Sequence, residues 1–361
     1  MRRATPCLAL SLIALALLPA SARALPRGFF GIAPQTPLGA EDTARMRAGG
    51  VGTIRVPLHW GGVQPTPDGG FNWTSFDESV TTAAEGGLEV LPFLCSPPRW
   101  ASRPETRLPI DNGRQRRAWA EFVRAAVERY GPRGVFWSEH APGTVQPLPR
   151  LPIHAWQIWN EENFFYFTRP ASPTRYAKLL RISHRAIHRV DPRATVVMGG
   201  LFGNPRQSPP TAMDAADFLD RLYAVRGVKA DFDAVALHPY AADAGELRVL
   251  VEGVRRVMLR HRDRRGALYL TEMGWGSQAR SPVSFEVGLR EQAGQLRAAY
   301  GYLLSNRRRL HLEQVDWFSW KDAPKLCSFC DSVGLFRRGA RFKPKPAWHA
   351  FVQVTRRARS R

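Results

Sequence analysis

Eight short apolar segments, separated by stretches with helical periodicity, are the feature that most restricts the fold of this chain. Runs of four to eight apolar residues indicate buried strands, whereas helices need longer segments. The segments comprise residues 29–32, 53–57, 88–94, 153–159, 195–198, 232–237, 267–271 and 315–320. Such predominantly apolar runs are typical of a parallel sheet whose outer face is covered by helices.

Amphipathic stretches follow most of these segments. The clearest is residues 116–130, where Trp119, Phe122, Val123 and Val127 recur at the spacing of one helix face. The predicted helices comprise residues 42–49, 75–85, 116–130, 174–190, 215–223, 246–261 and 286–305. Eight strands alternating with helices predict an α/β fold, the (β/α)8 TIM barrel. We expect one catalytic domain over residues 25–355, because no repeat or long linker divides them.

Residues 1–24 have the three parts of a secretory signal peptide. Arg2 and Arg3 form a positively charged N-terminal region, and twelve apolar or small residues follow from Cys7 to Leu18. Small residues precede a cleavage site after Ala24. Twelve residues are too few to cross a bilayer, which takes about 20. A short buried helix is the alternative. We expect cleavage and secretion, to the exterior or the periplasm, with Sec and twin-arginine export both open.

Three cysteines would remain after cleavage. Cys327 and Cys330 form a C-x-x-C pair, and Cys95 stands alone after an apolar run. A redox motif or half of a zinc site is possible for such a pair, but no second pair is present, and export favours oxidation. We predict a Cys327–Cys330 disulfide and a buried, unpaired Cys95.

The charge of the chain raises the question of nucleic-acid binding. The net charge is +21, and 46 of the 52 basic residues are Arg. These residues are scattered, whereas nucleic-acid proteins present clustered basic patches, so we expect no nucleic-acid partner. An anionic cell-envelope polymer is a simpler partner for such a surface. We expect no membrane span after cleavage, a monomer, and a disordered basic tail over residues 356–361.

Polar and aromatic residues collect where the predicted strands end. The residues are Arg55, His59 and Trp60 after the second strand, Asn160 and Glu161 after the fourth, His238 and Tyr240 after the sixth, Glu272 after the seventh, and Trp320 after the eighth. In a (β/α)8 barrel these ends meet at the face that carries the active site. Two carboxylates from different strands, amid aromatic residues, are what cleavage of a glycosidic bond requires.

Two of these strand ends resemble segments of clan A glycoside hydrolases. Residues 156–161, Trp-Gln-Ile-Trp-Asn-Glu, resemble the segment that carries the general acid/base of the clan. Residues 268–275, Leu-Tyr-Leu-Thr-Glu-Met-Gly-Trp, resemble the strand-seven segment that carries its nucleophile. The resemblance is nearest to family 39 and its bacterial relatives, with family 5 next, and it extends over most of residues 25–355.

The resemblance implies a role for each residue. Glu161 would be the acid/base and Glu272 the nucleophile of a retaining mechanism that needs no cofactor and no metal. Arg55 and Tyr240 would hydrogen-bond Glu272, and Asn160 would hold the sugar 2-hydroxyl. Glu162 is the rival for the acid/base, but we expect its side chain to point to the other side of the strand end.

The remaining site residues are expected to bind substrate. Trp320 would form a flat platform beneath a sugar ring, and His238, Trp60 and His59 would line the cleft. Packing in the barrel wall is the alternative for each of them. The sequence therefore predicts a retaining O-glycosyl hydrolase acting on an oligo- or polysaccharide, with a non-catalytic carbohydrate-binding barrel as the alternative. It leaves open the sugar, the linkage and whether the action is endo or exo.

Overall fold

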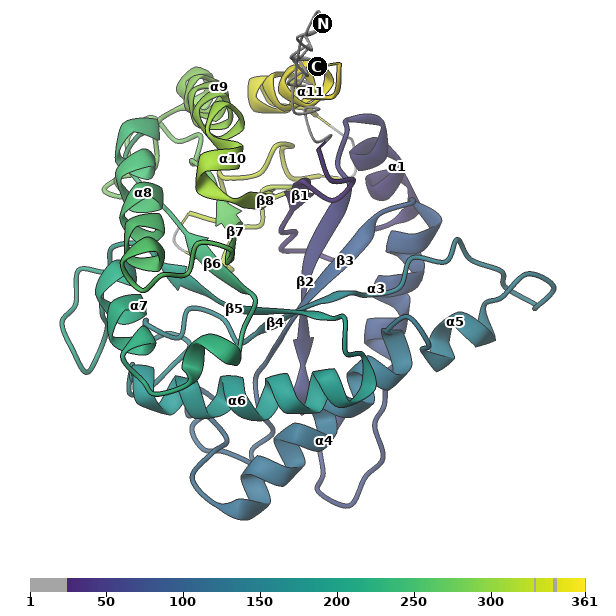
Figure 1. Cartoon of the computed structure of the whole chain (residues 1–361). Coiled ribbons are helices and arrows are strands. Elements are labelled where there is room, and N and C mark those ends of the chain that lie inside the picture. The colour runs from purple at the N-terminus through teal and green to yellow at the C-terminus, as the bar shows by residue number, and fades with distance from the viewer. Residues whose placement is uncertain (1–24, 328, 340–342, 361) are drawn as a thin grey trace, which may run out of the picture.

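Eight parallel strands close into a barrel in the order β1 to β8, as a computed structural model of the chain shows (Figure 1). The structure describes residues 25–327, 329–339 and 343–360. The strands are β1 Phe30–Ile32, β2 Thr53–His59, β3 Glu89–Cys95, β4 Ala155–Ile158, β5 Thr195–Phe202, β6 Ala234–His238, β7 Ala267–Met273 and β8 Leu312–Trp317. Pairing of β1 with both β2 and β8 closes the ring, which confirms the predicted (β/α)8 fold.

Helices surround the strands on the outside (Figure 1). They are α1 Ala40–Ala48, α2 Trp60–Val63, α3 Thr74–Glu85, α4 Gly113–Tyr130, α5 Val135–Glu139, α6 Pro173–Val190, α7 Ala215–Tyr223, the 3₁₀ turn Val228–Ala230, α8 Ala244–Arg260, α9 Leu289–Ser305, α10 Arg307–Leu310 and α11 Pro346–Arg359. In α4 the side chain of Asn112 caps the first turn by accepting a hydrogen bond from the Gln115 amide. The periodic face that identified α4 in the sequence is buried against the barrel.

Helix α11 corrects the expectation of a disordered tail over residues 356–361. The helix continues to Arg359, and Arg361 lies outside the described residues. Its buried residues include Ala347, Phe351 and Thr355, which repeat every four residues along one face. The Thr355 hydroxyl donates to the carbonyl of Gly49, so the last turns are anchored to the loop after α1. Arginine-rich composition concealed a helix because the charges occupy only its outer face.

The eighth strand also differs from its prediction. It spans Leu312–Trp317, three residues nearer the N-terminus than the predicted 315–320. Helix α9 likewise begins at Leu289 and not at residue 286. The shift moves the end of β8 from Trp320 to Trp317, and this matters for the aromatic residues discussed below.

Hydrogen bonds from Lys345 join two long loops at the C-terminal end of the barrel. The ammonium of Lys345 is buried and donates to Ser277 Oγ at 3.0 Å, to Asp322 Oδ1 at 2.6 Å and to the Ser332 carbonyl at 2.6 Å. Ser277 belongs to the β7–α9 loop, and the other partners belong to the β8–α11 loop. The predicted Cys327–Cys330 disulfide is present in the second of these loops, and Cys95 is buried and unpaired as expected.

The predicted signal peptide, residues 1–24, lies outside the described residues. Among the helices that the structure describes, none combines the length and the apolar character needed to cross a bilayer.

Candidate active site

Glu161 is turned into the barrel mouth by an unusual backbone at the end of β4. Trp159 has φ of 76° and Glu161 has φ of 44°, which L-residues other than glycine seldom adopt. The turn leaves Glu161 only 6% exposed. The next residue, Glu162, points away toward β5, where the missing Cβ of Gly199 leaves room for its carboxyl group. The side chain of Glu162 therefore points to the other side of the strand end, as expected from the sequence.

Glu272 lies near the end of β7 and receives two strong donors. Nη1 of Arg55 donates to Oε1 at 2.6 Å, and the Tyr240 hydroxyl donates to Oε2 at 2.7 Å. Both contacts were expected from the sequence. Because each donor favours the ionised carboxylate, they hold Glu272 both oriented and negative.

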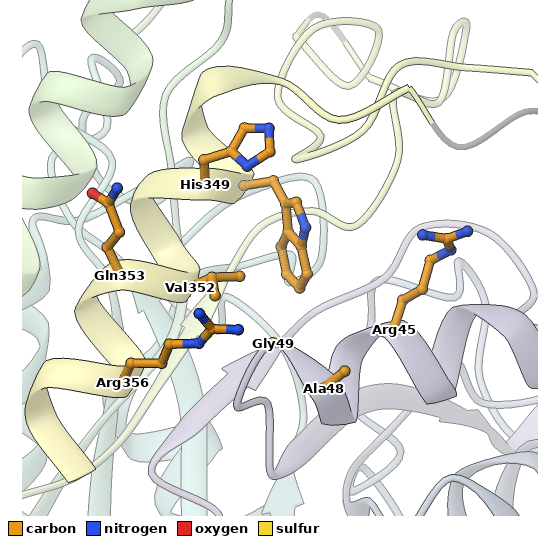
Figure 2. A pocket seen from close by; sticks show the side chains of 8 residues that line it. Arg45, Ala48, Gly49, His349, Val352, Gln353 and Arg356 are labelled. Carbon is orange, nitrogen blue, oxygen red and sulfur yellow. The ribbon is translucent and has the colours of Figure 1, made fainter. Parts of the chain in front are cut away.

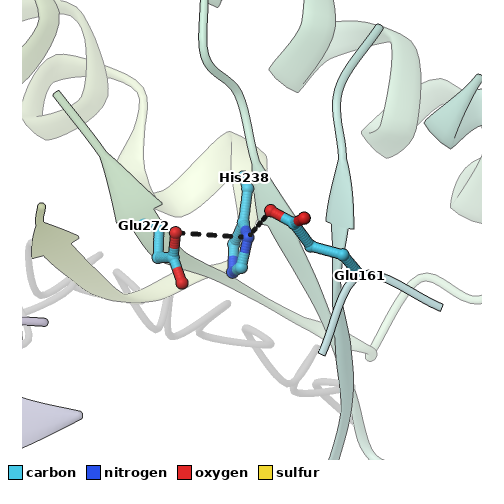
Figure 3. Close-up of side chains that lie close together, drawn as sticks. All are labelled: Glu161, His238 and Glu272. Carbon is cyan, nitrogen blue, oxygen red and sulfur yellow. Dashed lines mark hydrogen bonds and ion pairs between the residues drawn. The ribbon is translucent and has the colours of Figure 1, made fainter. Parts of the chain in front are cut away.

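His238 lies between the two carboxyl groups, as Figure 3 shows. Its Nδ1 is 2.9 Å from Glu161 Oε1 and 3.6 Å from Glu272 Oε2. The imidazole is fully buried at the end of β6. A Cβ at Gly200 on β5 would collide with the ring, so glycine is required there. The structure thus places His238 on the acid/base itself, a closer position than the cleft lining expected for it.

Arg55 links three parts of the site. Besides Glu272, it donates from Nε to Gln157 Oε1 and from Nη2 to Asn160 Oδ1, each at 2.6 Å. Its guanidinium also lies 4.0 Å from the centroid of the Phe93 ring. The amide oxygen of Asn160 is therefore engaged by Arg55, which leaves its amide nitrogen as the group able to donate to a bound molecule.

The electrostatics separate the two carboxyl groups. Burial raises the pKa of Glu161 well above its ordinary value, and the negative charge of Glu272 raises it further. The pKa of Glu272 is also raised, because burial outweighs the opposing effects of Arg55 and the Tyr240 hydroxyl, but it is not raised as far as that of Glu161. Burial, together with the charge of Arg55, holds the pKa of His238 well below its ordinary value, so the imidazole is neutral. The arrangement favours a protonated Glu161 beside an ionised Glu272.

The same three side chains are spaced closely enough to hold a metal ion. One ligand atom from each of Glu161, His238 and Glu272 lies within 4.8 Å of the others. Each of these atoms already has a protein partner, and the guanidinium of Arg55 adds a positive charge at Glu272. Their contacts are therefore accounted for by the carboxyl pair and its donors.

Two predicted substrate contacts are wrong. Trp320 is fully buried, donates from Nε1 to Asp42 Oδ1 at 2.6 Å and packs against Phe336, so it offers no platform to a sugar. The register of β8 explains the error, because the strand ends at Trp317. Trp60 is also fully buried, with its ring stacked on Phe122 of α4.

His59 stays at the rim, as predicted. It is exposed at the end of β2, and its Nδ1 lies 3.0 Å from the Ser96 hydroxyl at the end of β3. No described contact joins it to the carboxyl pair. Its part in binding therefore remains an expectation.

A group of aromatic rings around Tyr240 was not predicted. The rings of Phe202, Phe285, Phe318 and Phe329 surround Tyr240 at centroid distances of 5.2 to 6.0 Å. We call these four phenylalanines the aromatic wall. They come from β5 and from the two loops that Lys345 fastens, and Phe329 belongs to the disulfide loop. Since loop residues carry no periodic pattern, only their aromatic character could have pointed to them.

A separate groove lies on the outside of the barrel, between α1 and α11 (Figure 2). It has a volume of about 410 Å³ and is lined by Arg45, Ala48, Gly49, Trp348, His349, Val352, Gln353 and Arg356. The last turns of α1 and most of the length of α11 contribute to it. None of the lining residues belongs to the candidate active site.

Comparison with known proteins finds relatives in structure only. No protein-family model matches the chain, and no curated protein sequence matches it. A family 39 glycoside hydrolase from Bacteroides cellulosilyticus has a TM-score of 0.63 at 20% identity, with 90% of this chain and 63% of that chain covered. A glucosidase from Croceicoccus marinus gives 0.65 at 16%, covering 93% and 68%. A monomeric beta-xylosidase from Caulobacter crescentus gives 0.64 at 18%, covering 92% and 68%.

These solved structures are glycoside hydrolases, and this chain has their barrel fold. At such low identity the likeness establishes the fold alone. The chain also spans less than two thirds of the length of the family 39 enzyme. Any activity has to be argued from the site.

Proposed function

We propose that the protein is a retaining glycoside hydrolase. The observation that carries the proposal is the carboxyl pair: Glu161 and Glu272 have oxygen atoms within 4.8 Å of each other, and their partners favour opposite protonation states. Retaining enzymes hold their carboxyl groups about 5–5.5 Å apart, whereas inverting enzymes separate them by about 6.5–9.5 Å to admit a water.

The reaction follows from the charges of the two groups. The carboxylate of Glu272 attacks the anomeric carbon while the bond from that carbon to the leaving oxygen breaks. Glu161 donates its proton to this oxygen, and a glycosyl ester of Glu272 remains. The ester has no negative charge, so the pKa of Glu161 falls and the ionised group can accept a proton from water. The water oxygen attacks the anomeric carbon, the ester bond breaks, and the configuration is retained.

Asn160 and Arg55 support this chemistry. The amide nitrogen of Asn160 can donate to a sugar hydroxyl, and Arg55 fixes its direction. The aromatic wall offers apolar ring faces around Tyr240, the residue that donates to Glu272.

The test is a screen of aryl glycosides and polysaccharides with the purified chain. Hydrolysis with a first-formed product of the same anomeric configuration as the substrate, followed by NMR, is the expected result. A first product of inverted configuration would contradict the proposal, and so would the absence of hydrolysis across a complete screen.

The alternative is a carbohydrate-binding barrel without catalysis. The variant Glu272→Gln separates the two, because it keeps the shape of the site and removes the nucleophile. An enzyme should lose turnover in this variant and still bind the oligosaccharide by calorimetry. A binding protein should show no turnover even with Glu272 intact.

We also propose that the protein is exported after cleavage near Ala24 and that its basic surface adheres to acidic polymers. The groove between α1 and α11 supports adhesion, because Arg45 and Arg356 line it beside the indole of Trp348. Retention on an acidic polysaccharide should weaken as salt rises. Arg356→Glu should weaken it more than the matched exposed change Arg221→Glu on α7. Retention that is independent of salt would disprove adhesion, and a mature chain that starts at Met1 would disprove cleavage.

A further inference from the structure

A chain of hydrogen bonds runs from Arg55 to the acid/base through three buried side chains. Nε of Arg55 donates to Gln157 Oε1 at 2.6 Å, and Gln157 Nε2 lies 3.2 Å from Thr271 Oγ1. Thr271 Oγ1 lies 3.0 Å from His238 Nε2, and His238 Nδ1 lies 2.9 Å from Glu161 Oε1. Gln157, Thr271 and His238 are each fully buried, so their donors and acceptors must be matched among themselves.

The direction of the first two bonds is fixed by Arg55. A guanidinium only donates, so the atom of Gln157 that faces it must be the amide oxygen. The amide nitrogen then faces the other way, and its two protons have two acceptors, the carbonyl of Met198 at 3.3 Å and Thr271 Oγ1 at 3.2 Å. The opposite orientation of the amide would set two donors against each other.

The same count fixes the last two bonds. Thr271 Oγ1 accepts from Gln157 and has one proton to give. Within the described part of the chain, the other polar atom in reach of this hydroxyl is His238 Nε2. If Nε2 carried the proton, the hydroxyl of Thr271 would be buried with no acceptor, which costs about 1–3 kcal/mol. A neutral imidazole has one N–H, so Nε2 accepts and the proton is on Nδ1.

We propose that Gln157 and Thr271 are positioning residues that hold His238 in the Nδ1–H tautomer, with this N–H donating to Oε1 of Glu161. The consequence rests on the proposed function. With Oε1 occupied by a donor, the proton of the acid is on Oε2, free for the leaving group. When Glu161 is ionised, the same N–H still donates to it. One arrangement therefore serves both steps, and no proton moves on the imidazole.

The tautomer can be measured without any substrate. The chain labelled with ¹⁵N-histidine reports by NMR which nitrogen of each imidazole is protonated, and the His238→Gln variant identifies the signals of His238. We expect a protonated Nδ1 and an unprotonated Nε2 in the wild type and in Thr271→Ser, which keeps the hydroxyl. A proton on Nε2 in the wild type would overturn the proposal. The tautomer of the wild type decides the question, so this test does not depend on any variant of Thr271 that fails to fold.

Kinetics give the second arm of the test. Thr271→Val should lower kcat/KM by about tenfold or more for a substrate whose leaving group needs protonation. It should have little effect on an activated aryl glycoside, and Thr271→Ser should restore the loss. The matched control is Thr53→Val on β2, which also removes a buried hydroxyl bond, the one to the Gly28 carbonyl at 3.0 Å. An equal loss for both kinds of substrate would contradict the positioning role.

The two arms separate this proposal from the proposed function. A protein that turns over no glycoside and has the Nδ1–H tautomer would disprove the enzyme and support the hydrogen-bond chain. A protein that hydrolyses glycosides and has the Nε2–H tautomer would do the reverse.

Discussion

Glu161 and Glu272 belong to one buried cluster, yet their immediate partners differ in kind. Glu272 is held by the guanidinium of Arg55 and the hydroxyl of Tyr240, both of which stabilise a negative charge. The closest partner of Glu161 is the neutral imidazole of His238. The next residue in the chain, Glu162, is a second buried carboxyl group. Arg55 donates to Gln157 and Asn160, which both precede Glu161 in the sequence, but the hydrogen bonds of its guanidinium do not include Glu161.

The difference shows how one barrel gives two identical side chains opposite roles. Burial alone would raise the pKa of both carboxyl groups. The guanidinium of Arg55 decides which of them loses its proton first. Arg55 lies on β2 and contacts Glu272 of β7. We call the surroundings of Glu272, with Arg55, the charged side of the cluster, and the surroundings of Glu161, with His238 and Glu162, its neutral side. The following predictions test this division.

The largest effect is expected when each carboxyl group is removed in turn. Glu272→Gly should lower kcat by about 10⁶-fold, because no nucleophile remains. Azide fills the vacated space, so it should restore turnover and give a glycosyl azide of inverted configuration. In Glu161→Gly, azide should give the retained configuration, because Glu272 still forms the ester. The configuration of both products is measured by NMR, and identical configurations would contradict the assignment.

A second effect concerns the stability of the neutral side. Burial raises the pKa of Glu162 to about 8, against an ordinary value of 4.5, although the nearby hydroxyl of Tyr176 lowers it. Below pH 4.5 the folded and unfolded chains both hold this proton. Between the two pKa values only the folded chain holds it, so the unfolding free energy falls as pH rises, by about 3 kcal/mol at pH 7.

Glu162→Gln cannot ionise and should lose this pH dependence. We expect the variant to gain about 3 kcal/mol over the wild type between about pH 4 and pH 7, measured by urea unfolding at both values. Any packing change introduced by glutamine is the same at both pH values and cancels in the comparison. A difference between variant and wild type that does not change with pH would show that Glu162 is ionised in the folded chain.

The smallest effect is expected on the charged side. Tyr240→Phe removes one donor from Glu272 and keeps the ring that the aromatic wall surrounds. The loss of a hydrogen bond to a charged group should lower kcat/KM by about tenfold or more. The pKa of Glu272 should rise, so the acidic limb of the pH–rate profile should move to higher pH. An alkaline limb that moves instead would assign Tyr240 to the other carboxyl group.

The sequence predicted the barrel and the carboxyl pair because both depend on local patterns. Apolar runs located the strands, and residues at the C-terminal ends of such strands lie at the catalytic face of this fold. The contacts of Arg55 and Tyr240 with Glu272 were implied by the resemblance to clan A glycoside hydrolases. These contacts are confirmed by the structure.

Aromatic residues were harder to place. Trp60 and Trp320 follow strands in the sequence, but both pack outward under helices and loops, since the strand pattern does not say where a side chain points after the strand ends. The phenylalanines that do approach the site lie on loops or, for Phe202, at the last residue of β5. Gln157 and Thr271 gave a usable signal, because each is a polar residue inside an otherwise apolar strand run.

The central claim is that Glu272 forms the covalent bond to the sugar, and trapping tests it most directly. A 2-fluoro glycoside of a sugar that the protein hydrolyses, with an activated leaving group, reacts in the first step and is slow in the second, so the ester accumulates. Digestion and mass mapping should place one sugar on the peptide that contains Glu272. A label on Glu161, on Glu162 or on any other residue would contradict the account.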